Sequence, residues 1–398
     1  MNQTIGVFFG SRSPEHDVSI VTGEFVMRRL RDLNYRVVPV YIGKDGQWYI
    51  QEQLGKLKFF TNDASFSEQL AGSGWNRFYL DLEASRGKLA FCTKGWRKRT
   101  VEIDLVFPTV HGSGGEDGTL QGLCEMFQAP YVGCEVAASA VAMDKVLTKL
   151  ILQGAGIPTA KFIFFTKAEF NRERAAILAR LRRELNYPVI VKPARLGSSI
   201  GVAKIADPDT DALATSIEVA LQYDHKVLIE QAIEPVADLT VCVLGTEPVR
   251  LSLIQQSVFS RAVLDFTAKY LEEGGTQLGG KDTSVVIPAP LSPEVTEAIS
   301  EVARKIFRLL GCSGIARVDF LYNQKTGEWF ANEVNTLPGT LYHHLWERSG
   351  VPFDEVLQTL IKLAAERALE RRRLVYSFPS QLLTAAGSLK LAGNKLGL

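Results

Sequence analysis

The sequence has few cysteines, no excess of charge of either sign and no long apolar run. Its 398 residues include five cysteines: Cys92, Cys124, Cys134, Cys242 and Cys312. Because the number is odd and no two are spaced as C-x-x-C, the sequence indicates neither a disulfide framework nor a zinc knuckle. We therefore expect a protein of the reducing cytoplasm.

The balance of charge excludes another class of partner. The chain has 45 Lys and Arg against 44 Asp and Glu, a net charge of +1, so bulk attraction to nucleic acid or to a membrane surface is not expected. No apolar stretch approaches the roughly 20 residues of a membrane helix, and residues 1–10 lack the features of a secretory signal. Any anionic ligand must be held by local clusters of charge.

Apolar runs of strand length alternate with amphipathic runs of helix length, a pattern typical of mixed α/β layers. At about 150 residues per domain, the length predicts two or three domains. We place an N-terminal unit at 1–135, a central unit at 136–225, a third unit at 226–376 and an appended tail at 377–398.

The N-terminal unit opens with an expected strand at 5–9, a helix at 18–33 and a strand at 37–42. In such an opening the end of the first strand commonly forms the ligand site. One helix is expected over 136–153. The other expected elements are strands at 103–108, 162–165, 189–192, 202–205, 239–244, 249–255, 314–322 and 329–332, and helices at 119–128, 168–185, 293–310 and 353–372.

One glycine-rich loop has the features of a phosphate site. It follows the strand that ends in Lys192 and Pro193, and its sequence over 194–201 is ARLGSSIG. Glycines let the backbone approach a ligand, while serine hydroxyls, N–H groups and a lysine can bind phosphate oxygens. A plain hairpin explains the glycines but not the lysine and the two serines, and both interpretations stay open at this point.

A second cluster lies on a predicted hairpin. Residues two apart in a strand share a face, so Arg317 lies with Asp319 and Glu333 with Asn335. The register that sets Asp319 opposite Glu333 also sets Arg317 opposite Asn335. The alternative to a metal site is a surface salt-bridge ladder. We prefer magnesium or manganese, because all-oxygen ligands suit these ions and a ladder rarely needs an asparagine at its fourth corner.

These pieces together resemble a known family, the D-alanine:D-alanine ligases of the ATP-grasp superfamily. The resemblance spans roughly residues 4 to 370 with the motifs in family order. It rests on EHDVS at 15–19, HGSGGEDGT at 111–119, AMDK at 142–145, VKP at 191–193, GSS at 197–199, AKY at 268–270, RVD at 317–319 and NEVNTLPG at 332–339.

The resemblance implies a three-domain ATP-grasp architecture with an N-terminal α/β domain. It also implies ATP-dependent ligation of two D-alanines through a D-alanyl phosphate, with two magnesium or manganese ions, in a cytoplasmic homodimer that supplies peptidoglycan synthesis. A rival within the family joins D-alanine to D-lactate, D-serine or another amino acid. A nucleotide-binding module without turnover is disfavoured, because the metal carboxylates and Lys269 are all present.

Roles for single residues follow from the same resemblance. The expected ATP contacts are Lys145, Lys192, Ser198, Ser199, Glu230, Gln231, Ile233, Asp238 and Lys269, and the expected metal ligands are Asp319, Glu333 and Asn335. The expected catalytic residues are Glu15, Ser198, Tyr270, Arg317 and Gly339, and the expected substrate-binding residues are His111, His344 and Leu345.

The chain departs from the family pattern at several places. His344 stands where the family commonly has a hydroxyl residue for the carboxylate of the second substrate, which leaves that substrate open, although Tyr270 favours D-alanine. Asp238 stands where a glutamate usually meets the ribose. The segment 271–286 is longer than in many members, and the tail after Tyr376 has no counterpart.

Overall fold

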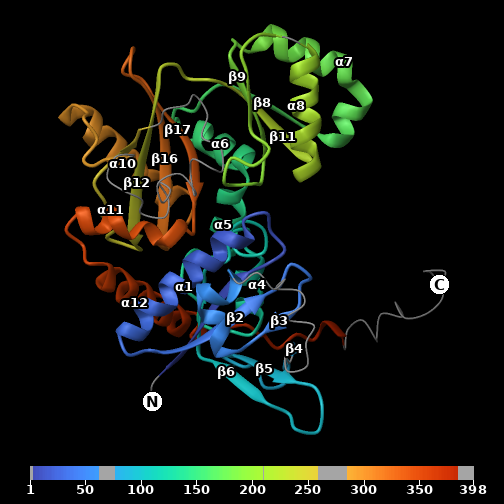
Figure 1. The fold of residues 1–398 in the computed structure, drawn as a ribbon, viewed down its shortest axis with the longest axis vertical. Coiled ribbons are helices and arrows are strands. Elements are labelled where there is room, and N and C mark those ends of the chain that lie inside the picture. The colour runs from blue at the N-terminus through green and yellow to red at the C-terminus, as the bar shows by residue number, and fades with distance from the viewer. Residues whose placement is uncertain (1–2, 62–76, 209, 259–284, 384–398) are drawn as a thin grey trace, which may run out of the picture.

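The computed structural model describes residues 3–61, 77–208, 210–258 and 285–383. These residues form three β-sheets, of seven, four and six strands. Figure 1 shows the first sheet in the lower body, the second at the upper right and the third at the upper left. The mixed α/β class predicted from the sequence is confirmed.

The first sheet has a parallel part and an antiparallel part. β1 (Thr4–Gly10) lies between β2 (Arg36–Ile42) and β7 (Leu105–Pro108), parallel to both. The helix α1 (His16–Asp32) follows β1, and α4 (Thr119–Met126) follows β7. The antiparallel part consists of β3 (Trp48–Tyr49), β4 (Arg77–Leu80), β5 (Leu89–Thr93) and β6 (Thr100–Ile103), beside the short helices η1 (Glu52–Gly55) and α2 (Leu57–Phe60).

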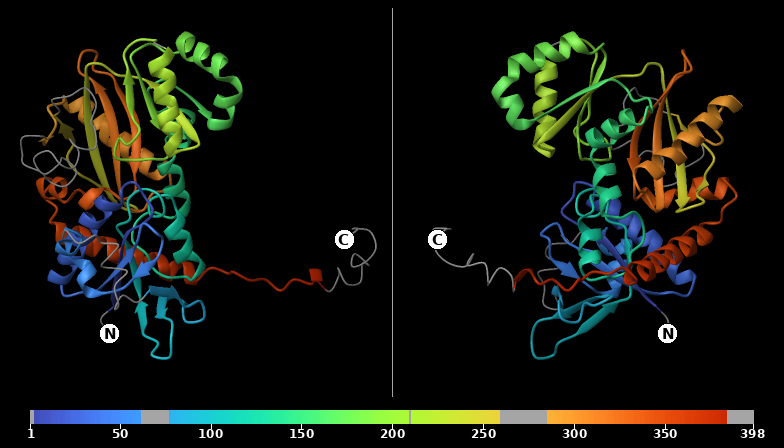
Figure 2. Two further views of the ribbon diagram at one scale, coloured as in Figure 1. Left: turned by 45° about the vertical axis from the view of Figure 1, so that its right-hand side comes forward. Right: turned by 180° about the vertical axis from the view of Figure 1, so that it is seen from behind.

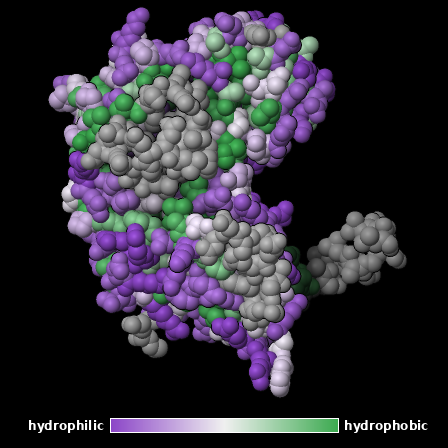
Figure 3. Space-filling view, viewed as in Figure 1, coloured by the Kyte–Doolittle hydropathy of each residue, from purple (hydrophilic) through white to green (hydrophobic). Residues whose placement is uncertain are grey.

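The second sheet has the strand order β10 (Ala203–Ile205), β9 (Val189–Pro193), β11 (Lys226–Gln231), β8 (Phe162–Thr166). Two helices pack on it, α7 (Lys167–Glu184) and α8 (Thr210–Tyr223). α7 was expected, and its outer side is mostly hydrophilic in Figure 3. α8 was not predicted.

Strand β11 corrects one assignment made from the sequence. Residues 226–230 were expected to open the third unit, but β11 pairs antiparallel with both β8 and β9. The second sheet therefore extends past residue 225, because β9 would otherwise lose the partner on one side. The other limits of the predicted units stay predictions.

The third sheet runs in the order β15 (Val285–Val286), β14 (Gln255–Ser257), β12 (Val236–Gly245), β16 (Gly314–Asn323), β17 (Trp329–Asn335), with β13 (Arg250–Leu251) beside β12. The amphipathic helix α10 (Pro293–Leu309) buries its apolar face against β12 and β16. The hairpin of β16 and β17 and the helix α10 confirm the sequence predictions.

The single helix expected over 136–153 is wrong. The chain forms α5 (Val136–Met143) and α6 (Lys145–Gly154), separated at Asp144, whose backbone is extended at φ −91° and ψ 100°. The Asp144 carboxylate accepts hydrogen bonds from the N–H groups of Val146 and Leu147, both at 3.1 Å. An aspartate that caps a helix in this way favours a new start over continuation.

The C-terminal helices join the third sheet to the first. The turn η4 (Gly339–Tyr342) leads into α11 (His343–Arg348) and α12 (Phe353–Arg372). One hydrophobic core contains residues of β1, α1, η4, α11 and α12, and Figures 1 and 2 show α12, in red, beside the blue N-terminal part. Within the described ranges, no helix is both long and apolar enough to cross a membrane.

Candidate active site

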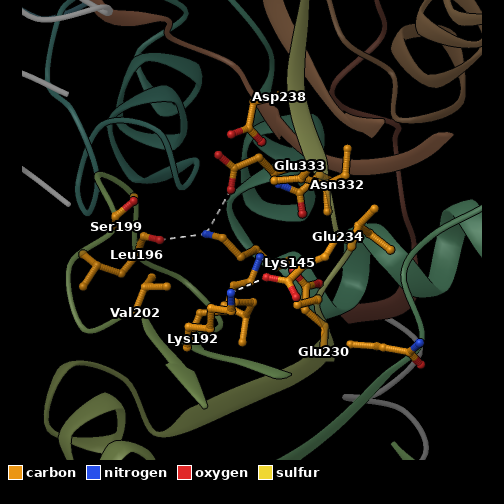
Figure 4. A pocket seen from close by; sticks show the side chains of 18 of the residues that line it. Lys145, Lys192, Leu196, Ser199, Val202, Glu230, Glu234, Asp238, Asn332 and Glu333 are labelled. Atoms are coloured by element: carbon orange, nitrogen blue, oxygen red, sulfur yellow. Dashed lines mark hydrogen bonds and ion pairs between the residues drawn. The ribbon is translucent and has the colours of Figure 1, made fainter. Parts of the chain in front are cut away.

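A cleft lies between the second and third sheets, and Figure 4 shows the side chains that point into it. One wall comes from β9, β11 and the loop after β9, and the other from β12, β16 and β17. All the described residues that the resemblance assigned to ATP line this cleft: Lys145, Lys192, Ser198, Ser199, Glu230, Gln231, Ile233 and Asp238. Lys269 and Tyr270 lie outside the described residues.

At the base of the cleft, Glu230 lies between two lysines. Its Oε1 forms an ion pair with Lys192, and its Oε2 lies 3.0 Å from Nζ of Lys149. The Glu230 side chain is only 2% exposed. Burial acts to raise the pKa of Glu230, but the charges of Lys149 and Lys192 outweigh it and lower the pKa to about 2.

Lys145 connects the two walls of the cleft. Its Nζ donates a hydrogen bond to the carbonyl oxygen of Leu196 at 2.7 Å and lies 3.6 Å from Oε2 of Glu333. The break at Asp144 makes Lys145 the first residue of α6. The lysine therefore brings a positive charge between the glycine-rich loop and the carboxylate hairpin.

The loop after β9 is held in an unusual conformation. Ser198 and Ser199 have φ of 55° and 56°, in the left-handed region that residues other than glycine seldom adopt. Nevertheless the Ser198 side chain is buried, and its Oγ donates a hydrogen bond to Oε1 of Glu15. The strained turn thus ties the second unit to the start of α1.

The carboxylate hairpin has the predicted register. Asp319 pairs with Glu333, and Arg317 pairs with Asn335. Arg317 Nε lies 2.9 Å from both Asp319 oxygens, Arg317 Nη2 donates to Asp319 Oδ2 at 2.6 Å, and Oγ1 of Thr240 donates to Asp319 Oδ1 at 2.8 Å. Burial raises the pKa of Asp319, against the effect of Arg317.

The donor set of the hairpin suits a hard cation. In the part of the chain that the structure describes, no three His, Cys, Asp or Glu side chains are arranged to hold a metal ion. The third ligand predicted for the hairpin is an amide, that of Asn335. The Asn335 Oδ1 already accepts from the N–H of Leu337 at 3.1 Å. Two carboxylates and one amide oxygen are oxygen ligands of the kind that magnesium and manganese take.

The loops around Gly112 and Gly197 enclose the side chain of Glu15. The carboxylate is 5% exposed, and its Oε2 is buried without a hydrogen-bond partner. A Cβ added at Gly112 would lie 2.6 Å from Glu15 Oε2, and one at Gly197 would lie 2.7 Å from Oε1, so both loops can approach this closely only as glycine. Burial, and then the charge of Glu116, raise the pKa of Glu15.

His111 lies close to Glu15 and Glu116 and is connected to the turn η4 through Thr22. Its Nε2 lies 2.9 Å from Oγ1 of Thr22, which also accepts a hydrogen bond from the N–H of Thr340 at 3.3 Å. Gly339 is buried just before this contact, in a turn where Thr340, Leu341 and Tyr342 all have positive φ, 45°, 53° and 52°. The Thr22 hydroxyl on α1 therefore helps to hold this turn.

His344 and Leu345 follow the same turn on α11. His344 Nε2 lies 2.8 Å from Oε1 of Gln255 on β14, and its ring contacts that of Tyr342 at 5.0 Å. The ring of Tyr342 in turn lies 5.1 Å from the guanidinium of Arg317. Burial lowers the pKa of His344 to about 4, so the imidazole is uncharged at neutral pH. Leu345 is fully buried.

Two family models match the chain. The model described as "D-ala D-ala ligase N-terminus" matches residues 4–134, and the one described as "D-ala D-ala ligase C-terminus" matches residues 151–362. The chain belongs to the D-alanine:D-alanine ligase family. This confirms the family and the ATP-grasp architecture that the motifs predicted, and membership implies the use of ATP and of D-alanine.

Relatives in this family match almost the whole chain. The D-alanine–D-alanine ligase of Geobacillus kaustophilus is 38% identical and covers 96% of this chain and 100% of its own length; that of Caldicellulosiruptor bescii is 36% identical and covers 94% and 98%. Among solved structures, the VanG D-Ala:D-Ser ligase from Enterococcus faecalis has a TM-score of 0.73 at 30% identity over 92% of this chain and 100% of its own. The D-alanine-D-alanine ligase from Coxiella burnetii has a TM-score of 0.72 at 26% identity over 98% and 99%.

Residues that contact the site but were not found from the sequence include Lys149, Thr22, Thr240 and Gln255. The signal for Lys149 was its spacing of four from Lys145, which places both lysines on one face of a helix. Thr22 and Gln255 lie within unremarkable helix and strand patterns. Only the packing of distant segments brings them to His111 and His344.

The low pKa of Glu230 predicts how stability depends on pH. The folded pKa of about 2 lies below the ordinary value of 4.5, so the ionised carboxylate adds stability above pH 4.5, and this contribution is lost as the pH falls toward 2. The contribution is about 3 kcal/mol. In urea unfolding at pH 6, 4.5 and 3, wild type should exceed Glu230→Gln in stability at pH 6, and the difference should shrink at pH 3. A difference independent of pH would contradict the ion pairs described for Glu230.

Proposed function

We propose that this chain ligates two D-alanines, using ATP and passing through a D-alanyl phosphate, to form the dipeptide used in peptidoglycan. The observation that carries the proposal is a cleft lined by Lys145, Lys192 and Glu333. Asp319 lies opposite Glu333 on the hairpin, and Glu15 is hydrogen-bonded to Ser198 in the wall of the cleft. The homodimer implied by the family resemblance belongs to the same proposal.

The cleft has the charges that the first step needs. A carboxylate is a poor acyl donor, so its oxygen attacks the γ-phosphorus of ATP and ADP leaves, giving an acyl phosphate. Both reactants are anions, and positive groups fixed in a buried site offset their repulsion. Lys145 and Lys192 line the cleft, and in this proposal they bind the phosphates. Lys269 has the same assignment by resemblance.

The carboxylate hairpin is the proposed site of two magnesium or manganese ions, held by Asp319, Glu333 and Asn335. Ions bound there would neutralise charge on the phosphates and orient them. The protein's own share is to hold Asp319 with Arg317 and Thr240, and Glu333 near Lys145. Arg317 and Lys145 thus offset the negative charges of Asp319 and Glu333.

Glu15 is the proposed receptor for the ammonium group of the first D-alanine. Its Oε2 is a buried acceptor with no partner, and an ammonium group is a donor of matching charge. Ser198 donates a hydrogen bond to the other oxygen, and His111 lies close to Glu15. The resemblance adds Tyr270 to this hydrogen-bonded set.

In the second step, the amine of the acceptor attacks the acyl phosphate and phosphate leaves. Negative charge then develops on the carbonyl oxygen, and donors fixed near it lower the barrier. Arg317 has a buried Nη1 without a hydrogen-bond partner, and we assign it and the backbone N–H of Gly339 to this oxyanion.

A ligase that joins D-alanine to a different acceptor is the second candidate. His344 favours it, since an uncharged imidazole held by Gln255 stands at the position assigned to the acceptor. The similarity to a D-Ala:D-Ser ligase structure points the same way. His344 and Leu345 are therefore the residues proposed to select the acceptor.

The function is tested by measuring phosphate release with ATP and magnesium and identifying the products by mass. The substrates are D-alanine, L-alanine, D-serine and D-lactate, each alone and each combined with D-alanine. We expect one phosphate per dipeptide with D-alanine alone. Release only when D-alanine is combined with D-serine or D-lactate would favour the second candidate. No release in any mixture that contains D-alanine would overturn both.

Replacing Glu15 by glutamine should chiefly weaken binding of the first D-alanine. The variant keeps the shape of the side chain but loses its charge, and a hydrogen bond to a charged group is worth about 1.5–3 kcal/mol, or roughly 10- to 100-fold in KM. Initial rates over a wide range of D-alanine concentration separate the KM of donor and acceptor. Asp17→Asn, an exposed carboxylate on the same helix, is the control. An unchanged donor KM in Glu15→Gln would contradict the assignment.

Replacing Glu333 by alanine should lower kcat at least about 100-fold, because the site loses a fixed charge at the phosphates. The chain should still fold, since the Glu333 side chain is 25% exposed. The measurement is ADP release at increasing magnesium, alongside thermal unfolding, with Glu328→Ala on the neighbouring exposed turn as control. Turnover near the wild-type rate would show that the hairpin is not the metal site.

A further inference from the structure

Lys149 is a buried cation to which the proposed reaction assigns no part. It lies on α6, one helical turn after Lys145, and its side chain is 0% exposed. Its Nζ lies 3.0 Å from Oε2 of Glu230. Lysines are almost never fully buried unless they are paired, so the partner of Lys149 is the Glu230 carboxylate.

The two lysines beside Glu230 are placed differently. Lys192 lines the cleft and is partly exposed to it, at 11% of its side chain. Lys149 does not line the cleft and lies behind Glu230. A ligand in the cleft can therefore contact Lys192 directly, whereas it reaches Lys149 only through Glu230.

This difference matters when nucleotide phosphates enter the cleft. A phosphate oxygen competes with Glu230 Oε1 for Lys192, and a buried carboxylate that loses its only counter-charge is strongly disfavoured. Because Lys149 remains paired with Oε2, Glu230 still has one positively charged partner when Lys192 binds a phosphate. Oε1 then becomes available to a new donor from the ligand.

We propose that Lys149 is a positioning residue of the nucleotide site, which holds Glu230 in place while Lys192 binds phosphate and Oε1 accepts a hydrogen from the base. The inference rests on the ATP use of the proposed function. By the family resemblance, the donor to Oε1 is the exocyclic amine of a 6-aminopurine. A 6-oxopurine presents a carbonyl oxygen at the same place, which a carboxylate repels. Lys149 thus acts on base selection through Glu230.

The test is a double-mutant cycle on nucleotide binding, measured by calorimetry with ATP or GTP and magnesium and without any amino acid. We expect Lys149→Met to weaken ATP binding at least tenfold and GTP binding less than threefold, so that the preference for ATP falls. In the Glu230→Gln background the same substitution should change ATP affinity less than threefold. Lys161→Met, an exposed lysine before β8, is the matched control.

Three results would overturn the proposal: ATP affinity within twofold of wild type in Lys149→Met, equal losses for ATP and GTP, or the same loss with and without Glu230. If Lys149→Met does not fold, the double variant Lys149→Met/Glu230→Gln, which no longer buries a carboxylate, is compared with Glu230→Gln alone. Equal ATP affinity supports the proposal, and a further tenfold loss refutes it. Since no amino acid is present, failure of the D-alanine reaction leaves this result unaffected. A wild type that binds no ATP counts against it.

Discussion

The site depends on buried or partly buried charges that are paired with charges of opposite sign, and most of these pairs join different elements. Lys149 on α6 and Lys192 on β9 meet Glu230 on β11, Lys145 on α6 approaches Glu333 on β17, and Arg317 holds Asp319 within β16. A buried charge is tolerated only when it is paired. The electrostatic requirement therefore fixes where α6 lies relative to the second and third sheets, and the same pairs supply the charge that a triphosphate meets.

The N-terminal part is joined to this centre by a few hydrogen bonds. Ser198 reaches Glu15 from the second unit, and the turn after Gly339 reaches Thr22 from the third. Glu15 and Thr22 lie at and just after the start of α1, which follows the end of β1. The site proposed for the first amino acid thus lies where two segments distant in sequence touch one helix.

Features set by local rules could be predicted from the sequence. The alternation of side chains in a strand placed Arg317 with Asp319 and Glu333 with Asn335, and the structure has the register in which these pairs face each other. The bulge between Asp319 and Phe320, which shifts the strands into that register, was not predicted. The break at Asp144 was missed because apolar spacing continues across it, and only the cap shows the new start. Strand β11 was assigned to the wrong unit, since strand patterns do not identify their partners. The contacts of Gln255 and Thr22 depend on tertiary packing, which no local pattern contains.

The turn of Thr340, Leu341 and Tyr342 limits how this enzyme could be redesigned. These three successive residues have left-handed backbone although none is glycine. Burial of the Leu341 and Tyr342 side chains and the hydrogen bond from Thr340 to Thr22 hold this conformation. Inserting or deleting a residue here would release that conformation and move Gly339, His344 and Leu345 together. At the proposed acceptor site, specificity is therefore more accessible through exchange of side chains on α11 than through grafting of a loop from another ligase.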